Sequence, residues 1–432
     1  MHDILQAGPQ TTAAPNTRTV AAAGPPGLRL ASAFQPILSL PHRRIVGHEA
    51  LLRGQDASGQ AVPPVQLFAA RDAAGQMALD EAALELHLRN FAAQRQEPVL
   101  APSPLWLFVN LRPASFLRTL DSQAALAQAL RAAGNDASAN PTPGLGSASP
   151  VVVEVTEEIV SRDMDFEGCA AQARALGCLL ALDDFGAGHS NFDRVWRLQP
   201  EIVKLDRSLV QRGATEPRAA RVIAQMVSLL HECGSLVLME GVETADEAHL
   251  ALDCDADLVQ GYFFGRPQAT LLQDQDASPQ VGSIWRRLGQ RSGHHNQADR
   301  QRIAPYSLAI AGAAQALAAS QPMRQACAAF LQLPGAQLCY LLDEDGIQHG
   351  TSLVAPQHSA TGEQRFAPMR DTAQACWARR PYFRRALDAP GTVQLTRPYL
   401  SVQGAHLCVT VSISLLVDGR TLVVCGDLAW NH

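Results

Sequence analysis

Short apolar runs alternate with longer helical patterns from Phe34 to about residue 264. Eight of these runs have the composition of strands. In chain order they read FQPILSL, IVGHEALLR, LWLFVNL, VVVEVTE, LLALDDF, EIVKLD, LVLMEGV and LVQGYFF. The stretch PPVQLFAARDAAGQMALDEAALELHLRNFAAQ is long enough for two helices, and AALAQALRAAG and AARVIAQMVSLLHECG each end at a glycine. Alternating strands and helices predict a parallel α/β fold, and eight strands favour a (β/α)8 barrel.

The pattern changes after residue 272, where polar segments flank a possible short helix around Trp285. Residues 273–302 are therefore predicted to be a connector. Beyond it, SLAIAGAAQALAAS predicts a packed helix and AQLCYLLDEDGIQHGTSL predicts two strands around an Asp-Gly turn. Several antiparallel strands follow, so a smaller α+β domain is expected over residues 303–432. Residues 1–29, rich in Ala, Thr, Pro and Gly, predict a flexible tail.

Composition narrows the classes of function. The formal charge of −6 gives no support for binding to DNA, and no apolar run approaches the length of a membrane span. The nine cysteines are odd in number and form no CxxC pair, which favours reduced thiols in the cytoplasm over disulfides. The first residues do not resemble a secretory signal.

Polar side chains gather at the ends of the predicted strands, where barrel enzymes carry their catalytic groups. They are Glu49, Asn110, Glu154, Asp183, Asp184, Lys204, Glu240 and Gln260. Each has an ordinary alternative when taken alone, such as a helix cap for an acid or a solvated surface position for a lysine. Together, however, they form an oxygen-rich shell of the kind that Mg²⁺ or Mn²⁺ prefers. Adjacent aspartates would repel unless cations lay between them.

The ordered motifs resemble the EAL family of cyclic di-GMP phosphodiesterases. The motifs are FQPIL, EALLR, FVNLRPASF, VEVTEE, LDDFGAGHSN, VKLDRSLV, MEGVETADE and QGYFFGRP, within residues 30–272. The resemblance implies a modified TIM barrel whose first strand runs against the others. It also implies hydrolysis of cyclic di-GMP to linear pGpG with two divalent cations, Mg²⁺ or Mn²⁺. No GG[DE]EF string is present, so no cyclase domain is expected.

The same resemblance implies a role for each residue. Glu49, Asn110, Glu154 and Asp183 would hold one cation, and Asp183, Asp184 and Glu240 the other. Lys204 would orient the attacking water or assist its deprotonation, with Glu49 and Glu240 beside it in the catalytic set. Gln35, Arg53 and Gln260 would lie near the substrate, and Glu157, Glu243, Gly186 and Gly188 would support the loop that couples dimer contacts to the site. This loop has His189-Ser190-Asn191-Phe192 where the family commonly has Tyr-Ser-Ser-Leu.

The last domain is similar to PAS-like and Cache-like sensor domains. Candidates for contacting a small-molecule signal are Arg380, Tyr382, Tyr399 and Asp427. A domain that only dimerises would bury aromatic side chains in the same way, so both interpretations stay open. We expect this domain to regulate a homodimer.

Two other functions are compatible with parts of the pattern. One is a receptor that binds cyclic di-GMP without cutting it, although such a protein typically lacks some ligands that are all present here. The other is a glycosidase with paired acids, which accounts less well for Asn110 and Lys204.

Overall fold

The computed structural model describes residues 17–19, 28–95, 105–111, 151–156, 166–188, 192–273, 282, 301–357, 372–401 and 407–430. The chain divides into two compact units, Met1–Leu288 and Gly289–His432. Several predicted features lie outside the described residues: the helix in AALAQALRAAG, the helix around Trp285, and the side chains of Glu157, His189 and Asn191. None of the described helices is long and apolar enough to cross a membrane.

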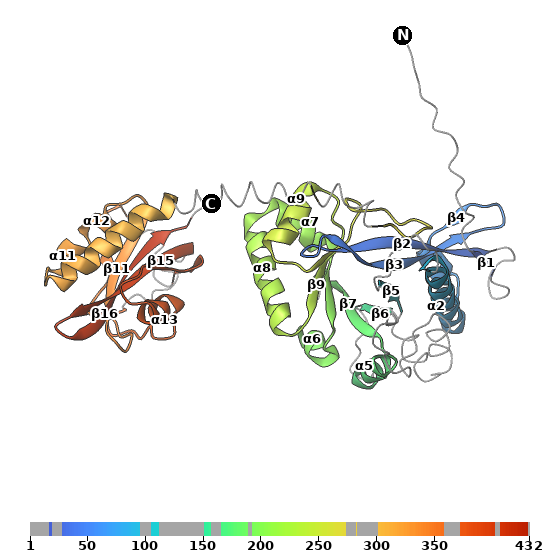
Figure 1. Ribbon diagram of the computed structural model, residues 1–432, viewed down its shortest axis with the longest axis horizontal. Coiled ribbons are helices and arrows are strands. Elements are labelled where there is room, and N and C mark those ends of the chain that lie inside the picture. The colour runs from blue at the N-terminus through green and yellow to red at the C-terminus, as the bar shows by residue number, and fades with distance from the viewer. Residues whose placement is uncertain are drawn as a thin grey trace, which may run out of the picture. The chain divides into compact units, whose positions relative to one another are not determined.

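Eight strands close into a barrel in the first unit (Figure 1). They are β2 (Arg29–Ser39), β3 (Arg44–Gln55), β5 (Trp106–Asn110), β6 (Val151–Thr156), β7 (Leu179–Phe185), β8 (Ile202–Leu205), β9 (Leu236–Met239) and β10 (Leu258–Val259). Neighbouring strands from β3 through β10 pair in parallel, whereas β2 is antiparallel to both β3 and β10. The predicted barrel with a reversed first strand is therefore confirmed.

Two short strands extend this sheet. Strand β1 (Thr17–Thr19) lies within the predicted tail and pairs antiparallel with Arg29 to Ala31, and β4 (Ala61–Val62) pairs with β3.

The helices of the first unit follow the predicted order. They are α1 (Pro64–Ala69), α2 (Ala73–Arg95), α5 (Phe166–Ala175), α6 (Phe192–Leu198), α7 (Arg207–Thr215), α8 (Pro217–Glu232) and α9 (Ala245–Asp253). The region predicted to hold two helices contains α1 and α2. A capping box fixes the start of α9, because Thr244 accepts from the backbone of Glu247 and the Glu247 carboxylate accepts from the backbone of Thr244.

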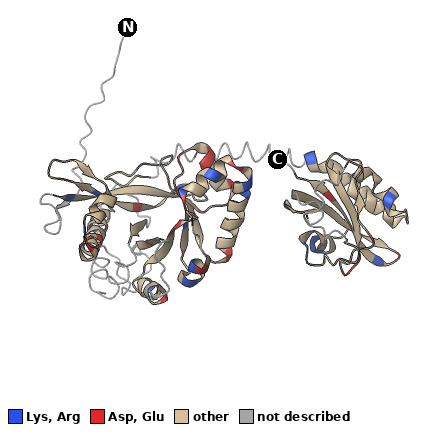
Figure 2. Cartoon of the chain, turned by 180° about the vertical axis from the view of Figure 1, so that it is seen from behind, with Lys and Arg blue, Asp and Glu red and all other residues tan. Residues whose placement is uncertain are grey.

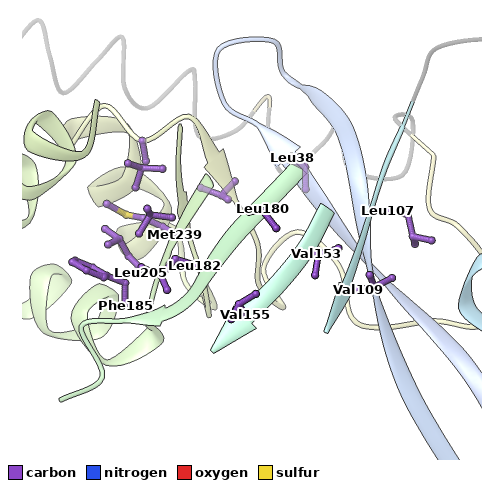
Figure 3. Close-up of a cluster of buried hydrophobic side chains, with 14 of the residues drawn as sticks. Leu38, Leu107, Val109, Val153, Val155, Leu180, Leu182, Phe185, Leu205 and Met239 are labelled. Atoms are coloured by element: carbon purple, nitrogen blue, oxygen red, sulfur yellow. The ribbon is translucent and has the colours of Figure 1, made fainter. Parts of the chain in front are cut away.

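The barrel strands are apolar on both faces, as expected for parallel strands covered by helices. Their outward side chains, among them Val153, Leu180, Leu182 and Leu205, are buried in one large cluster with residues of the surrounding helices (Figure 3). A second cluster fills the barrel interior and contains Ile37, Phe108, Val152, Ala181, Ile202, Leu238 and Leu258. The interior of the barrel is thus a packed apolar core. The residues at the strand ends form the layer above it.

The second unit is built on an antiparallel sheet in the order β12-β11-β16-β15-β13, with β14 also paired to β15. Its strands are β11 (Ala336–Leu342), β12 (Leu353–Val354), β13 (Gln394–Leu395), β14 (Tyr399–Leu400), β15 (Leu407–Val417) and β16 (Arg420–Ala429). Its helices span residues 301–318, α11 (Met323–Ala326), α12 (Ala328–Leu331) and α13 (Pro381–Asp388). The predicted packed helix and the predicted antiparallel strands are both present.

Alternation along β15 and β16 gives this sheet two different faces. Val409, Val411 and Val424 pack with Phe330 and the helix over residues 301–318. The opposite face carries Tyr340, Val423 and Cys425 against α13. On that side Ser412 and Ser414 donate to backbone carbonyls of α13, so the second face is the more polar one.

Candidate active site

A ring of polar side chains lies directly above the apolar layer of the barrel interior. Each polar residue is two positions along its strand from a residue of that layer, and side chains two apart point to the same face of a strand. The pairs are Ile37 and Gln35, Phe108 and Asn110, Val152 and Glu154, Ala181 and Asp183, Ile202 and Lys204, Leu238 and Glu240, and Leu258 and Gln260. Gln35 precedes its partner because β2 runs in the opposite direction, and it stands opposite Glu49 in the β2–β3 register.

Lys204 lies at the centre of the acidic part of this ring. Its Nζ is 2.5 Å from Glu154 Oε1, 2.5 Å from Glu240 Oε1 and 3.1 Å from Asp183 Oδ1. Its side chain is only 1% exposed. Of the 35 lysine and arginine residues in the chain, Lys204 is the single lysine. A compact ammonium fits where a planar guanidinium is too large, which accounts for a lysine at this position.

Glu49 is held by amides rather than by the lysine. Asn110 donates to Glu49 Oε1 at 2.7 Å, and Gln260 donates to Glu49 Oε2 at 2.6 Å. Gln260 also donates to Gln35 at 3.3 Å, and Gln35 donates to the backbone of Gly265. This network fixes the Glu49 carboxylate in one orientation.

The adjacent aspartates reach the same space because β7 is irregular. In a regular strand Asp183 and Asp184 would point to opposite faces. Here the pairing to β8 shifts between Leu182 and Phe185, and Asp184 has a φ of 56°. This bulge turns Asp184 so that Asp183, Asp184 and Glu240 each offer an oxygen within 4.8 Å of the others.

Gly186 closes the turn after these aspartates. Its φ is 100°, and a Cβ there would lie 2.0 Å from Leu209 Cδ1. A side chain at this position would therefore displace the Leu209 side chain and would be strained at this φ. Among the described residues, none lies within 4 Å of a Cβ built at Gly188, so within this part of the chain sterics require a glycine at position 186 and not at position 188.

Electrostatics of the ring reflects its excess of acids. Burial, opposed by Lys204, leaves the pKa of Glu154 well above its ordinary value and raises the pKa of Glu240 to about 8. Burial also opposes ionisation of Glu49, but Lys204 and the hydrogen bonds from Gln260 and Asn110 hold its pKa below the ordinary value. Burial disfavours charge on Lys204, yet the surrounding carboxylates raise its pKa well above 10.5. Lys204 is thus protonated, and the acidic side chains around it outnumber this single positive charge.

This donor set fits hard divalent cations. Its members are carboxylate and amide oxygens, which suit Mg²⁺ or Mn²⁺ and not zinc. The acids exceed the nearby positive charge, and Gln260 Oε1 is buried without a hydrogen bond from any described residue. Figure 2 shows acidic residues on strands inside this unit as well as on its outer helices.

The other predicted residues lie outside this cluster. Arg53 lies four residues after Glu49 on the same face of β3. Its side chain is exposed, and its guanidinium donates a hydrogen bond to the backbone carbonyl of Leu52. Glu243 pairs with Arg207 of α7 at 3.0 Å and 3.1 Å. Sequence reasoning missed Arg207, although it stands next to Asp206 in the quoted motif VKLDRSLV.

In the second unit, the four candidate sensor residues line one small cavity of about 30 Å³ on the α13 face of the sheet. Arg380, Tyr382, Tyr399 and Asp427 are joined there by Tyr340, Gln348, Trp377 and Ser401. Tyr340 and Trp377 were missed because an isolated aromatic residue in a strand or loop indicates burial and not a site.

The first unit is an EAL domain. The family model of the EAL domain matches residues 27–267, more than half of the chain, and the chain therefore belongs to this family. The family match does not extend into the second unit, so the PAS-like or Cache-like resemblance stays a prediction.

Curated relatives match the same region. The cyclic di-GMP phosphodiesterase RocR of Pseudomonas aeruginosa is 28% identical over 235 residues, covering 54% of this chain and 56% of RocR. The cyclic di-GMP phosphodiesterase PA2567 of the same organism is 30% identical over 238 residues, covering 54% of this chain and 38% of that protein. The chain thus spans about half, or less, of the length of these relatives.

A solved structure matches across both units. The Bacillus subtilis YkuI protein, with an EAL domain, in complex with substrate c-di-GMP and calcium, has a TM-score of 0.74 and 19% identity. The match covers 93% of this chain and 97% of YkuI. At this identity it shows a shared fold, including residues of the second unit.

Proposed function

We propose that this chain hydrolyses one phosphodiester bond of cyclic di-GMP to give linear pGpG. The observation that carries the proposal is the complete polar ring, with Lys204 between three carboxylates at the ends of neighbouring strands. Membership of the EAL family and relatives named as cyclic di-GMP phosphodiesterases support it.

Two divalent cations complete the proposed site. Glu49, Asn110, Glu154 and Asp183 would hold one, and Asp183, Asp184 and Glu240 the other. When bound, they would lower the pKa of a coordinated water and offset negative charge on the phosphate. The raised pKa values of Glu154 and Glu240 support this assignment, because a bound cation would offset the burial and the repulsion between acids that together keep protons on these groups.

Lys204 acts as a fixed cation in this proposal. In the metal-free site the surrounding carboxylates raise its pKa, so as an ammonium it can donate hydrogen bonds to the attacking water or to a phosphate oxygen. The prediction that it orients the water is therefore favoured over the prediction that it assists deprotonation.

A carboxylate of the ring takes the proton instead. Water adds to phosphorus, the bond from phosphorus to the 3′ oxygen breaks, and the water's proton passes to a carboxylate. The leaving oxygen gains a proton in turn. Glu49 is the candidate for this step because its lowered pKa keeps it ionised, and therefore able to accept a proton, and because Asn110 and Gln260 fix its orientation.

The substrate is proposed to contact the rim of the barrel. The exposed guanidinium of Arg53 is available for a phosphate oxygen. Gln35 and Gln260, which are already linked to each other and to Glu49, would contact the ligand or the water.

Regulation belongs to the same proposal. We place the second unit as a sensory or dimerisation module of a homodimer. The eight described cysteines are free thiols, which supports the proposed cytoplasmic location.

A direct assay tests the activity. The purified chain is incubated with cyclic di-GMP and either Mg²⁺ or Mn²⁺, and pGpG is measured by chromatography. We expect pGpG with metal and none with EDTA. Tight binding of cyclic di-GMP without pGpG under either metal would establish a receptor instead.

A further inference from the structure

A cavity in the second unit combines a buried acid with aromatic walls. It lies between α13 and the polar face of the sheet, has a volume of about 30 Å³ and is lined by Asp427 of β16 together with Tyr340, Trp377, Tyr382 and Tyr399. That volume holds an ammonium group or one or two waters, since one water requires about 10–15 Å³.

Asp427 is a buried carboxylate without a cationic partner among the described residues. It is only 5% exposed. Both of its hydrogen bonds are accepted by Oδ1, from Thr410 at 2.7 Å and Tyr340 at 3.4 Å, so Oδ2 accepts none from the described part of the chain. Burial raises the pKa of Asp427 to about 6. A buried acid of this kind is stabilised when a cation enters beside it.

The aromatic rings around Asp427 also favour a cation. Tyr382 stacks on Tyr399 with ring centres 6.4 Å apart, and Tyr340 meets Tyr382 edge to face at 6.2 Å. The Tyr399 hydroxyl is hydrogen-bonded to Thr410 at 2.6 Å, which orients the ring. Aromatic faces attract ammonium groups, most strongly where water is excluded.

A wider pocket of about 260 Å³ adjoins the cavity and has the opposite charge. The two spaces share Arg380, Tyr382 and Tyr399, and the wider one adds Arg385 and Arg397. No acidic residue is among its described lining residues. Three guanidinium groups around one pocket suit a carboxylate.

Arg380 stands at the junction of the two spaces. Its Cζ is 5.7 Å from the centre of the Trp377 ring and 5.9 Å from that of Tyr399. These contacts hold the guanidinium over the aromatic walls and leave Asp427 unpaired. The Asp427 carboxylate and the Arg380 guanidinium are therefore each available to a different group of one ligand.

We propose that the second unit binds a small zwitterion of the amino-acid type, with its ammonium group beside Asp427 among the aromatic rings and its carboxylate at Arg380, Arg385 and Arg397. A polyamine satisfies Asp427 but meets three like charges in the wider pocket. A dicarboxylate satisfies the arginines but leaves Asp427 without a cation. The wider pocket is near the lower limit of about 300 Å³ for small-molecule sites, which favours a ligand of amino-acid size.

Isothermal titration calorimetry on the full chain tests this proposal. The probes are the twenty protein L-amino acids and 4-aminobutyrate, with spermidine as a cation without a carboxylate and succinate as an anion without an amine. We expect at least one zwitterion to bind with a Kd below about 100 μM, or about −5.5 kcal/mol, and neither control to bind at that concentration.

Two variants separate the contributions of the charges. Asp427→Asn keeps the shape and the bonds from Thr410 and Tyr340, whereas Arg380→Gln removes the shared guanidinium; each is expected to weaken binding at least tenfold. Arg420→Gln, an exposed arginine at the start of β16, is the matched control and should leave the Kd unchanged. Three results would overturn the proposal. The first is that no zwitterion binds, and the second is that spermidine or succinate binds as tightly as any zwitterion. The third is that neither variant changes the Kd of the zwitterion.

Binding of the zwitterion to the second unit does not depend on the proposed phosphodiesterase activity. An effect of the zwitterion on turnover would depend on that activity. Calorimetry and pGpG release are therefore measured on the same preparation. Zwitterion binding by a chain that makes no pGpG would leave the ligand site standing and refute only the proposed enzyme, and pGpG release without zwitterion binding would do the reverse.

Discussion

Lys204 Nζ lies 2.5 Å from Glu154 Oε1, and neither side chain is more than 1% exposed. A buried ion pair of this kind is costly to break, because the remaining partner keeps an uncompensated charge in a medium that solvates it poorly. The pair therefore serves as the fixed centre of the site, around which Asp183 and Glu240 place two further carboxyl groups.

Replacing Lys204 by arginine should damage the site although the charge is kept. The guanidinium is larger than the ammonium and has no room among three carboxylates, so we expect turnover to fall at least about 100-fold, as for loss of one positioned donor. Overpacking should also cost about 1–3 kcal/mol of stability. Steady-state rates of pGpG release and urea unfolding measure the two effects.

Arg212→Lys is the matched control for that variant. Arg212 is 67% exposed and pairs with Glu216 on the surface, so exchange of the two cations should leave rate and stability unchanged. Wild-type turnover by Lys204→Arg would contradict the argument from size.

The protonation of Lys204 can be observed directly, because it is the single lysine of the chain. Surrounding carboxylates outweigh burial and raise its pKa above 10.5. With lysine labelled by ¹⁵N at Nζ, NMR should show one side-chain signal that stays in the ammonium form through pH 10.5. A titration midpoint below the ordinary lysine value would exclude the role as a fixed cation.

Asp184→Asn should separate the charge of Asp184 from its backbone conformation. Asparagine also tolerates the positive φ observed here, so the bulge and the fold should be kept. Loss of one carboxylate from the cluster with Asp183 and Glu240 should weaken Mn²⁺ binding at least tenfold, measured by calorimetry. Unchanged Mn²⁺ affinity would show that Asp184 is not a ligand.

Gly186 and Gly188 form a matched pair for the turn after the aspartates. Gly186→Ala places a methyl group against Leu209 at a φ of 100°, and we expect a loss of roughly 2 kcal/mol or more with reduced turnover. Gly188→Ala meets no atom of the described residues and should change stability by less than about 0.5 kcal/mol. Equal effects of the two substitutions would argue against the steric account.

Asp427 should make the stability of the second unit depend on pH. Its folded pKa of about 6 is above the ordinary value of 3.8, so the folded state favours the protonated form. The stabilisation is complete below pH 4 and is lost as pH rises through 6, by about 3 kcal/mol for a shift of about two units.

Hydrogen exchange of β15 and β16 measures this dependence between pH 4 and pH 8, after correction for intrinsic exchange rates. Asp427→Asn should remove most of the slope, whereas Asp418→Asn, at an exposed turn position, should keep it. Equal slopes in wild type and Asp427→Asn would place the pH dependence elsewhere.

Most of the barrel could be predicted from local patterns. Runs such as VVVEVTE and LLALDDF are apolar on both faces because parallel strands are covered on both sides, and all eight predicted runs overlap the strands of the barrel. The polar residues at the strand ends were found because catalytic groups of barrels collect there. The roles given to them stay predictions.

The hydrogen bonds within the ring of polar side chains could not be predicted from local sequence patterns. Asn110 and Gln260 both donate to Glu49, from strands on opposite sides of β3 in the closed sheet. Such contacts depend on closure, which brings residues 211 positions apart in the chain within hydrogen-bond distance. The positive φ of Asp184 likewise arises from the shifted pairing of β7 with β8.

The sequence by itself determined the order of strands and helices, the division into a barrel region and an antiparallel region, and the residue types at the strand ends, because periodicity and turn residues are local properties of the chain. Only the tertiary structure decided which acids surround Lys204, how two adjacent aspartates face one site, and that Asp427 and Arg380 line one cavity. These depend on strand register and burial, which arise from contacts between residues far apart in the sequence.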